Sequence, residues 1–305
     1  MFPIRPSRPN AYTGNPLDRA GIRRNDGSWI AEKRADPSSV FVPVWRARNL
    51  LRQAVNGAPD AVFLSGSDAN PLRDTDLPWA FLGLEEGRAV FTVDLSALET
   101  PDPLIDGAAF TDLRMVGAGM RATDAAILAH ARGLMHWRAR HRFCGLCGAP
   151  CEPQSAGHVM ACTGCQTHHF PRTDPAVIML VTSGDRALLG HSQRFPKSQM
   201  YSTLAGFVEP GESLEEAVAR EVVEESGVIV GQVYYHSSQP WPFPGSIMLG
   251  FYAEGLTEEI VINLEELTDA RWFTRAEMRA SKDHGFLLPR QDSIARRLIE
   301  DWMAA

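Results

Sequence analysis

The sequence predicts an α/β protein in which a C-terminal domain packs helices on a mixed sheet and follows an α+β N-terminal domain. Two observations lead to this fold class. Strand-like runs precede a long helical segment in the first half, and strand-like runs surround one acidic helix in the second. All five cysteines lie between these halves, from Cys144 to Cys165. Because 305 residues suffice for about two domains, we expect domains at 1–140 and 171–305, joined by a small cysteine-rich unit at 141–170.

The first domain combines strand and helix patterns. The runs AVFLSG at 61–66, WAFLGL at 79–84 and RAVFTVDL at 88–95 predict strands, and the Glu-Glu-Gly turn between the last two predicts a hairpin. Apolar residues at helical spacing predict a helix over 124–141. Since this domain carries no chemical motif, we expect a scaffold or dimerisation role for it. The chain shows no internal sequence repeat.

The second domain is rich in strands and closes with a helix. The segment QDSIARRLIEDWM at 291–303 is amphipathic at helical spacing. Strands are predicted from the apolar runs at 176–181, 186–191, 228–237 and 247–255.

Composition and charge exclude several classes of protein. Hydrophobic residues make up 44% and charged residues 22%, which is typical of a globular chain. A net charge of -7 argues against a protein that coats nucleic acid through its overall field. No apolar run approaches the roughly 18 to 20 residues of a membrane span, and the N-terminus lacks the apolar core of a signal peptide. We therefore expect a cytoplasmic protein that does not bind membranes.

The cysteines have the spacing of a zinc site. Cys144 and Cys147 form one C-x2-C pair, Cys162 and Cys165 form a second, and fourteen residues separate the pairs. Four thiolates close the tetrahedral shell of one structural zinc ion and leave no position for water. Cys151 is a spare thiol. Metal-free thiols, disulfides, or a histidine ligand in place of one cysteine are the alternatives, the candidate histidines being His158, His168 and His169.

A short helix between 206 and 228 is unusually acidic. Ser213 followed by Glu216 is a capping box, and Gly227 is a typical C-terminal stop, so a helix is predicted over 214–226. At 100° per residue, Glu221 and Glu225 fall on the same stripe as the apolar residues that face the sheet. Glu224 borders that stripe.

Carboxylates that face a core require neutralisation. A buried carboxylate is costly, and like charges four residues apart on a helix repel each other. Oxygen ligands without sulfur suit a hard divalent cation such as Mg²⁺ or Mn²⁺, which keeps several waters and reaches substrate phosphates. The acidic helix therefore predicts a divalent-metal site.

The full pattern around this helix resembles the Nudix box. Gly206, five residues, Glu212, seven residues, Arg220-Glu221-Val222, one residue, Glu224-Glu225, one residue and Gly227-Val228 occupy every fixed position of the box. The chain is thus similar to the Nudix hydrolases, which split nucleoside diphosphates linked to another group. The resemblance implies an α/β/α sandwich.

A second motif narrows the resemblance to one subfamily. SQPWPFPGS at 238–246 contains three prolines in five residues, which predict a rigid loop that carries aromatic rings. The same string after a Nudix box is typical of the NADH pyrophosphatase subfamily. The four-cysteine zinc ribbon before the box and FPRTDPAVI at 170–178 resemble the same subfamily, and the resemblance extends from about residue 124 to the C-terminal helix.

This resemblance implies roles for individual residues. Arg220 orients the box glutamates by ion pairs, and Glu224 is either a further metal ligand or a general base. The implied catalytic residues are Glu212, Arg220, Glu221, Glu224 and Glu225. The implied ligands of two or more Mg²⁺ or Mn²⁺ ions are the Ala205 carbonyl, Glu221, Glu224, Glu225 and Glu266. The implied substrate contacts are Phe170, Phe207, Gln239, Trp241 and Ser246.

The resemblance also implies a reaction. Metal-dependent hydrolysis of the pyrophosphate bond of NADH or NAD would give AMP and nicotinamide mononucleotide, and the same chemistry removes NAD caps from RNA 5′ ends in relatives. Another nucleoside diphosphate such as ADP-ribose is the nearest alternative substrate. A non-catalytic nucleotide or RNA sensor is the alternative from another class. Relatives are homodimers, so we expect a homodimer.

Overall fold

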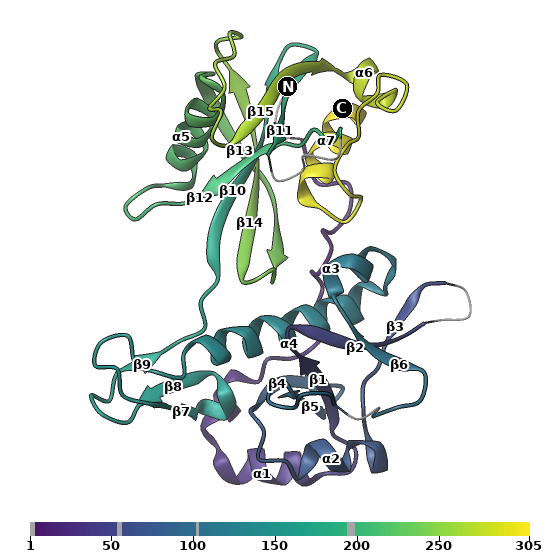
Figure 1. The fold of residues 1–305 in the computed structure, drawn as a ribbon, viewed down its shortest axis with the longest axis vertical. Coiled ribbons are helices and arrows are strands. Elements are labelled where there is room, and N and C mark those ends of the chain that lie inside the picture. The colour runs from purple at the N-terminus through teal and green to yellow at the C-terminus, as the bar shows by residue number, and fades with distance from the viewer. Residues whose placement is uncertain (1–3, 54–56, 102–103, 194–198) are drawn as a thin grey trace. The chain divides into compact units, whose positions relative to one another are not determined.

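The computed structural model describes residues 4–53, 57–101, 104–193 and 199–305. The chain forms two compact units, each with its own sheet (Figure 1). The N-terminal unit consists of Tyr12–Thr173 with Trp241–Gly245, and the remainder forms the C-terminal unit, which also includes residues 4–11. The three-part division at 140 and 170 stays a prediction.

The main sheet of the N-terminal unit has the order β4-β5-β1-β2, with β3 and β6 both paired to β2. Its strands are β1 (Val40–Trp45), β2 (Arg48–Gln53), β3 (Pro59–Ala61), β4 (Trp79–Glu85), β5 (Arg88–Asp94) and β6 (Ala108–Thr111). Its helices are η1 (Gly21–Asn25), α1 (Gly27–Ala35), η2 (Gly66–Ala69), α2 (Asn70–Arg73), α3 (Leu113–Val116), η3 (Gly117–Gly119) and α4 (Ala122–Arg140).

Most of the elements predicted for this part are present. The β4–β5 hairpin and helix α4 confirm the predicted strands at 79–84 and 88–95 and the predicted helix. The strand predicted over 61–66 is wrong, because only Ala61 belongs to β3 and Leu64 forms an isolated bridge. Gly66 ends the extended conformation with a φ of 58° and begins a 3-10 turn.

A small antiparallel sheet carries the cysteine-rich segment. It has the order β7-β8-β9. Its elements are β7 (Cys151–Gln154), η4 (Ser155–Gly157), β8 (Val159–Cys162) and β9 (His168–His169).

The sheet of the C-terminal unit is mixed. Its order is β13-β14-β10-β11-β15, with β12 paired to β10, and β10 runs parallel to β14. The edge strand β13 continues through Pro240 to Trp241, so part of the predicted proline loop is strand, which an edge position permits. The elements are β10 (Asp174–Ser183), β11 (Arg186–Ser192), β12 (Leu204–Phe207), α5 (Leu214–Ser226), β13 (Val230–Trp241), β14 (Ser246–Gly255), β15 (Leu267–Thr274), α6 (Arg275–Arg279) and α7 (Ile294–Ala304).

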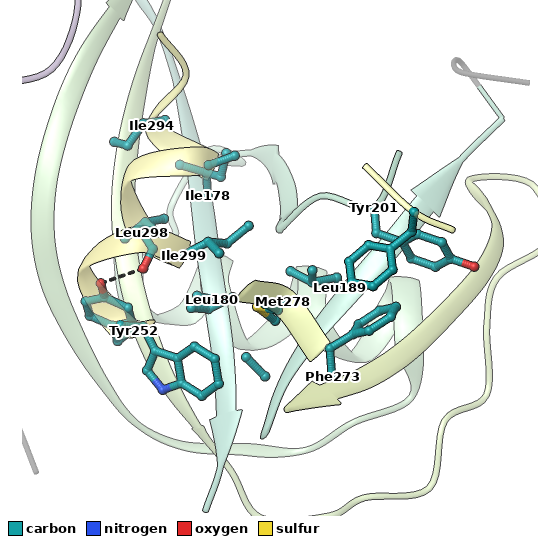
Figure 2. Close-up of a cluster of buried hydrophobic side chains, with 14 residues drawn as sticks. Ile178, Leu180, Leu189, Tyr201, Tyr252, Phe273, Met278, Ile294, Leu298 and Ile299 are labelled. Carbon is teal, nitrogen blue, oxygen red and sulfur yellow. Dashed lines mark hydrogen bonds between the residues drawn. The ribbon is translucent and has the colours of Figure 1, made fainter. Parts of the chain in front are cut away.

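Strand β10 shows how the two faces of this sheet are covered. Its side chains alternate, so that Val177 and Met179 pack in the cluster of α5, whereas Ile178 and Leu180 pack in the cluster of α7 (Figure 2). On the α7 side the buried Tyr252 hydroxyl donates to a helix carbonyl, that of Leu298, at 2.8 Å. Helices therefore cover both faces, and the predicted α/β/α sandwich is confirmed.

The main sheets of the two units share one strand order, except that the third strand pairs with the second strand in the N-terminal unit and with the first strand in the C-terminal unit. Numbered within its own unit, each sheet has the order 4-5-1-2-6, and in both the first and fifth strands are parallel. The helix after the third strand differs, because α2 has 4 residues where α5 has 13. A structural repeat is therefore present although no sequence repeat predicts it.

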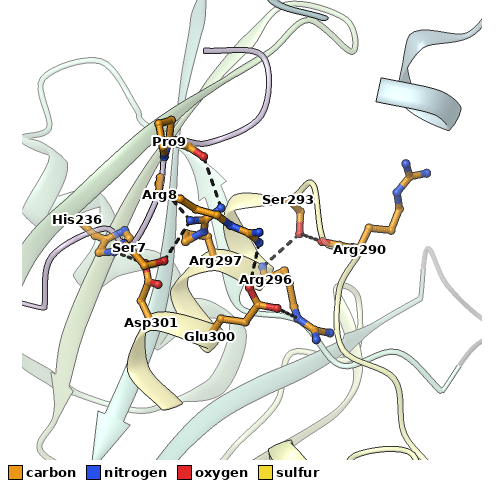
Figure 3. A network of polar contacts seen from close by, with 10 residues as sticks. All are labelled: Ser7, Arg8, Pro9, His236, Arg290, Ser293, Arg296, Arg297, Glu300 and Asp301. Atoms are coloured by element: carbon orange, nitrogen blue, oxygen red, sulfur yellow. Dashed lines mark hydrogen bonds and ion pairs between the residues drawn. The ribbon is translucent and has the colours of Figure 1, made fainter. Parts of the chain in front are cut away.

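The N-terminal segment is tied to α7 within the C-terminal unit (Figure 3). Arg297 donates to the Arg8 carbonyl at 3.1 Å, and the Ser7 N–H donates to Asp301 at 3.2 Å. Asp301 also accepts from the buried ring of His236 at 3.1 Å. None of the helices in the described ranges has the length and apolar character required to cross a membrane.

Candidate active site

The acidic helix α5 begins and ends as predicted. The Glu216 N–H donates to the Ser213 side chain at 3.2 Å, and the Ser213 N–H donates to the Glu216 carboxylate at 2.7 Å. Gly227 ends the helix with a left-handed φ of 70°. The apolar side chains of α5 pack on the sheet, and Glu221 and Glu225 continue that buried face, 8% and 5% exposed.

A third carboxylate joins them from the loop before β15. The N–H groups of Val261 and Asn263 donate to the last carbonyls of α5, at 2.8 and 3.1 Å, and so hold this loop against the helix end. Oxygen atoms of Glu221, Glu225 and Glu266 all lie within 4.8 Å of one another. Three carboxylates from two separate segments therefore meet at one point.

Strand β12 lies beneath this carboxylate group. The Ala205 N–H donates to the Glu225 carboxylate at 3.1 Å. Because the N–H and C=O of one strand residue point to the same side, the Ala205 carbonyl also faces the side of α5. Gly206 has no side chain where the Glu221 carboxylate lies, and any Cβ there would overlap it.

Arg220 connects the carboxylates of the box. Its guanidinium donates to Glu212 at 2.6 and 3.0 Å, to Glu221 at 2.9 Å, to Glu224 at 2.9 Å and to the Phe207 carbonyl at 2.9 Å. All five N–H donors of the arginine are thereby used. Hydrogen bonds from Arg220 lower the pKa of Glu212 to about 2. The network fixes the side chains around Glu221 in one arrangement.

The carboxylate group fits a divalent cation. Burial raises the pKa of Glu221, and the charges of Glu224 and Glu266 raise it further, against the lowering by Arg220. A cation would offset this repulsion, and three carboxylates with a backbone carbonyl form the oxygen-rich donor set that hard divalent ions take. Residues of α5, β12 and the loop before β15 thus form a candidate divalent-metal site.

The four predicted cysteines form a separate group that fits zinc. The Sγ atoms of Cys144 and Cys165 are 3.6 Å apart, and those of Cys147 and Cys162 are 3.4 Å apart. Zinc–sulfur bonds of about 2.3 Å give sulfur separations of about 3.8 Å in a tetrahedron. All four Sγ atoms lie within 4.8 Å of one another, and none is in a disulfide. The set fits one structural zinc ion, and Cys151 lies outside it.

The residues predicted to contact substrate have different environments. Phe207 is 60% exposed beside the carboxylate network, and Phe170 is 62% exposed in the N-terminal unit. Ser246 is half-buried at the start of β14, opposite Asp174. Trp241 packs edge-on against Tyr12 and Phe243 in the N-terminal unit, with ring centroids 6.4 and 5.1 Å away.

Gln239 has a different role from the predicted substrate contact. Its side chain is fully buried, and its amide donates to the Asp292 carbonyl at 2.7 Å. Its carbonyl oxygen accepts from the Ile294 N–H, the first residue of α7, at 2.8 Å. Both ends of the amide are bound by backbone groups, so Gln239 supports the start of α7.

Comparison with known proteins agrees with this site. Residues 172–298 match the NUDIX domain model, and residues 139–170 match the NADH pyrophosphatase zinc ribbon domain. A protein of Stutzerimonas stutzeri named NAD-capped RNA hydrolase NudC is 44% identical over 73% of this chain and 76% of its own.

The chain belongs to the Nudix hydrolases of the NADH pyrophosphatase family. This Nudix hydrolase is also 45% identical to the NAD-capped RNA hydrolase NudC of Mycobacterium bovis, over 73% of this chain and 75% of the relative. It is 40% identical to the NAD-capped RNA hydrolase NUDT12 of Homo sapiens, over 96% of this chain and 73% of the relative.

The comparisons add one domain that the sequence analysis did not identify. Residues 38–137 of this Nudix hydrolase match the NADH pyrophosphatase-like rudimentary NUDIX domain. The shared 4-5-1-2-6 strand order and the four-residue α2 are the structural counterparts of that description. Pairing between backbone groups places few requirements on residue type, so the sequence pattern does not reveal the repeated strand order. The backbone hydrogen bonds that hold the Glu266 loop were not predicted for the same reason.

Proposed function

We propose that this Nudix hydrolase cleaves the pyrophosphate bond of NADH and NAD and removes NAD from the 5′ ends of capped RNA. The observation that carries the proposal is the convergence of Glu221, Glu225 and Glu266 beside the exposed ring of Phe207. The curated relatives named NAD-capped RNA hydrolases support the choice of substrate. Water adds to one phosphorus, the P–O anhydride bond breaks, and NADH yields AMP and reduced nicotinamide mononucleotide.

We assign the metal-binding role to residues of α5 and its neighbours. Two or more Mg²⁺ or Mn²⁺ ions would be held by the Ala205 carbonyl and the carboxylates of Glu221, Glu225 and Glu266. When bound, such ions neutralise a diphosphate and lower the pKa of a bound water. Glu224, whose side chain is 51% exposed and held by Arg220, serves as a further ligand or accepts the proton of the attacking water.

The remaining residues position these groups and the substrate. Arg220 and Glu212 hold the Glu221 carboxylate in place. The exposed Phe207 ring offers a stacking surface for a nicotinamide or adenine ring. Phe170, Trp241 and Ser246 are further substrate contacts in this proposal, and Gln239 acts by supporting α7. We also propose a homodimer, which light scattering of the 33.6 kDa chain would test.

The reaction is tested by chromatography of NADH, NAD and ADP-ribose after incubation with the protein and Mg²⁺ or Mn²⁺. We expect AMP and reduced nicotinamide mononucleotide to form fastest from NADH, and a Glu225→Gln variant to lose this activity. NAD-capped RNA, assayed in parallel, should lose its cap and keep a 5′ monophosphate. Faster cleavage of ADP-ribose than of both dinucleotides would refute the proposed substrate. Binding without cleavage of all four substrates would instead favour a sensor.

A further inference from the structure

The N-terminal unit contains a large pocket that has no part in the proposed reaction. It has a volume of about 1010 Å³, and all its lining residues belong to that unit. They come from η1 and α1, from the segments at the start of β4 and the end of β5, from the end of α4, and from the cysteine-rich segment around η4. A space of this size accommodates a small organic molecule.

Positive charge dominates the wall of this pocket. Four arginines line it, and two carboxylates, Asp76 and Asp94, are the acidic groups that line it with them. Four positive charges against two negative ones leave an excess of two. Asp94 already accepts a hydrogen bond from the Ser96 N–H at 2.9 Å. Among the residues that the structure describes, no ion pair involves any of the four arginines, which are Arg24, Arg34, Arg138 and Arg142.

Arg138 is the most buried of these arginines. It is 8% exposed, yet its guanidinium makes one hydrogen bond, to the Trp79 carbonyl, and its Nε has no partner among the described residues. Burial lowers the pKa of Arg138 to about 10. The charge of Asp94 opposes this lowering only in part. A buried cation without an ion pair is costly, and a buried N–H without an acceptor adds to that cost. An anion in the pocket would relieve both.

The guanidinium groups of Arg34 and Arg24 also have only some of their hydrogen-bond donors bound. Arg34 donates to the Thr75 carbonyl at 2.7 Å and lies over the Trp79 ring at 4.7 Å, and Arg24 donates to the Arg19 carbonyl at 3.3 Å. In both arginines Nε is buried without a hydrogen-bond acceptor in the described part of the chain. Three guanidinium groups around one space are thus only partly bound. Arginine forks of this kind match the oxygen geometry of phosphate.

Apolar side chains form the rest of the wall. Ile30, Leu77 and Met160 line the pocket together with several alanines. A free phosphate ion would not contact this apolar surface and would fill only a small part of the pocket. An organic phosphate of nucleotide size fills the volume and places its dianionic group against the two excess positive charges.

We propose that this pocket of the N-terminal unit binds a phosphate monoester of nucleotide size, with the phosphate on the arginines that line the pocket and the organic part against the apolar wall. The site is distinct from the carboxylate group of α5. It gives the N-terminal unit a ligand of its own.

The test is calorimetric titration of the whole chain with AMP and, separately, with inorganic phosphate. No Mg²⁺ or Mn²⁺ is added, so that the carboxylates of α5 lack the cation that would bind phosphate there. We expect saturable binding of AMP, with inorganic phosphate weaker. Arg138→Gln and Arg142→Gln should each weaken AMP binding by about tenfold. Arg142 is exposed, so its variant should keep the melting temperature of the parent.

Two matched variants distinguish binding in this pocket from binding at α5 or at exposed arginines. Arg52→Gln removes an exposed arginine of β2 that does not line the pocket, and it should leave AMP binding unchanged. Glu221→Gln should also leave it unchanged. Loss of AMP binding in Glu221→Gln would place AMP at the α5 site and overturn the proposal. The proposal would also be overturned if Arg138→Gln and Arg142→Gln both bound AMP as tightly as the parent, or if the parent bound no AMP at millimolar concentration. Inorganic phosphate binding as tightly as AMP would overturn the nucleotide-sized ligand.

Discussion

A Cβ atom on Gly206 would lie 1.8 Å from the carboxyl carbon of Glu221 and 1.9 and 2.2 Å from its two oxygens. The side chain of Glu221 therefore rests directly on the backbone of β12. This contact explains why the box begins with a glycine, fifteen residues before the glutamate whose carboxylate packs against it. The two residues act as one unit, since the carboxylate occupies the volume that the glycine leaves open.

Gly206→Ala should abolish most activity with little loss of fold. The added methyl group displaces the Glu221 carboxylate, and displacement of a catalytic group by about 1 Å costs about 100-fold in rate. Steady-state hydrolysis of NADH measures the effect. Gly21→Ala is the matched control, because a Cβ there meets no atom within 4 Å. Full activity of Gly206→Ala would show that Glu221 tolerates another position.

Arg220→Lys should lower kcat far more than it raises KM. Lysine keeps the charge but cannot reproduce the five hydrogen bonds that Arg220 gives to three carboxylates and a carbonyl. We expect about 100-fold lower kcat for NADH. Arg271→Lys, which changes an exposed pair with Asp269, is the control and should retain activity. A change confined to KM would argue against a positioning role.

Glu266→Gln and Glu265→Gln should differ sharply although the residues are neighbours. Glu266 shares the carboxylate group with Glu221 and Glu225, whereas the exposed Glu265 is outside it. Loss of one ligand charge should raise the Mn²⁺ concentration needed for half-maximal activity about tenfold in Glu266→Gln alone. Titration of activity with Mn²⁺ measures this. Identical curves for the two variants would remove Glu266 from the metal site.

Cys162→Ser should release zinc, whereas Cys151→Ser should retain it. The Cys162 sulfur lies among the four ligands and accepts N–H groups of Gly164 and Cys165 at 3.3 and 3.4 Å. Metal analysis should find one zinc per chain in the parent and in Cys151→Ser, and much less in Cys162→Ser. A lower melting temperature should accompany the loss, because structural zinc contributes directly to folding. Zinc retained by Cys162→Ser would exclude the four-cysteine site.

His158 should make the fold sensitive to mild acid. Burial lowers its pKa to about 4, while its Nε2 hydrogen bonds to the Phe81 carbonyl at 2.7 Å. Since the unfolded chain protonates this histidine near pH 6.5, the stability it contributes is present above that pH and falls as the pH drops toward 4.

The loss from His158 amounts to about 2 kcal/mol between pH 7 and pH 5. Urea unfolding at these two pH values measures it. His158→Gln, which has no titrating group, should lose about that much less stability than the parent over the same interval. Equal losses in both proteins would mean that His158 is protonated in the folded state.

The sequence by itself determined the features that depend on local geometry. The capping box, the stop at Gly227 and the stripe that carries Glu221 and Glu225 all follow from helix periodicity over one short segment. The two C-x2-C pairs likewise specify tight turns that aim sulfurs at one point. Such patterns are readable because each residue type is required by its immediate neighbours.

Only the tertiary structure decided what depends on burial and on backbone pairing between distant segments. Gln239 lies in the proline-rich motif, yet its fully buried amide supports α7. The loop of Glu266 is held to α5 by backbone hydrogen bonds, which the residue types of the loop do not predict. The strand order that repeats in both sheets, and the arginine-lined pocket beside the first, arise in the same way. Many different sequences can form the same backbone pairing, so the amino-acid sequence alone does not predict it.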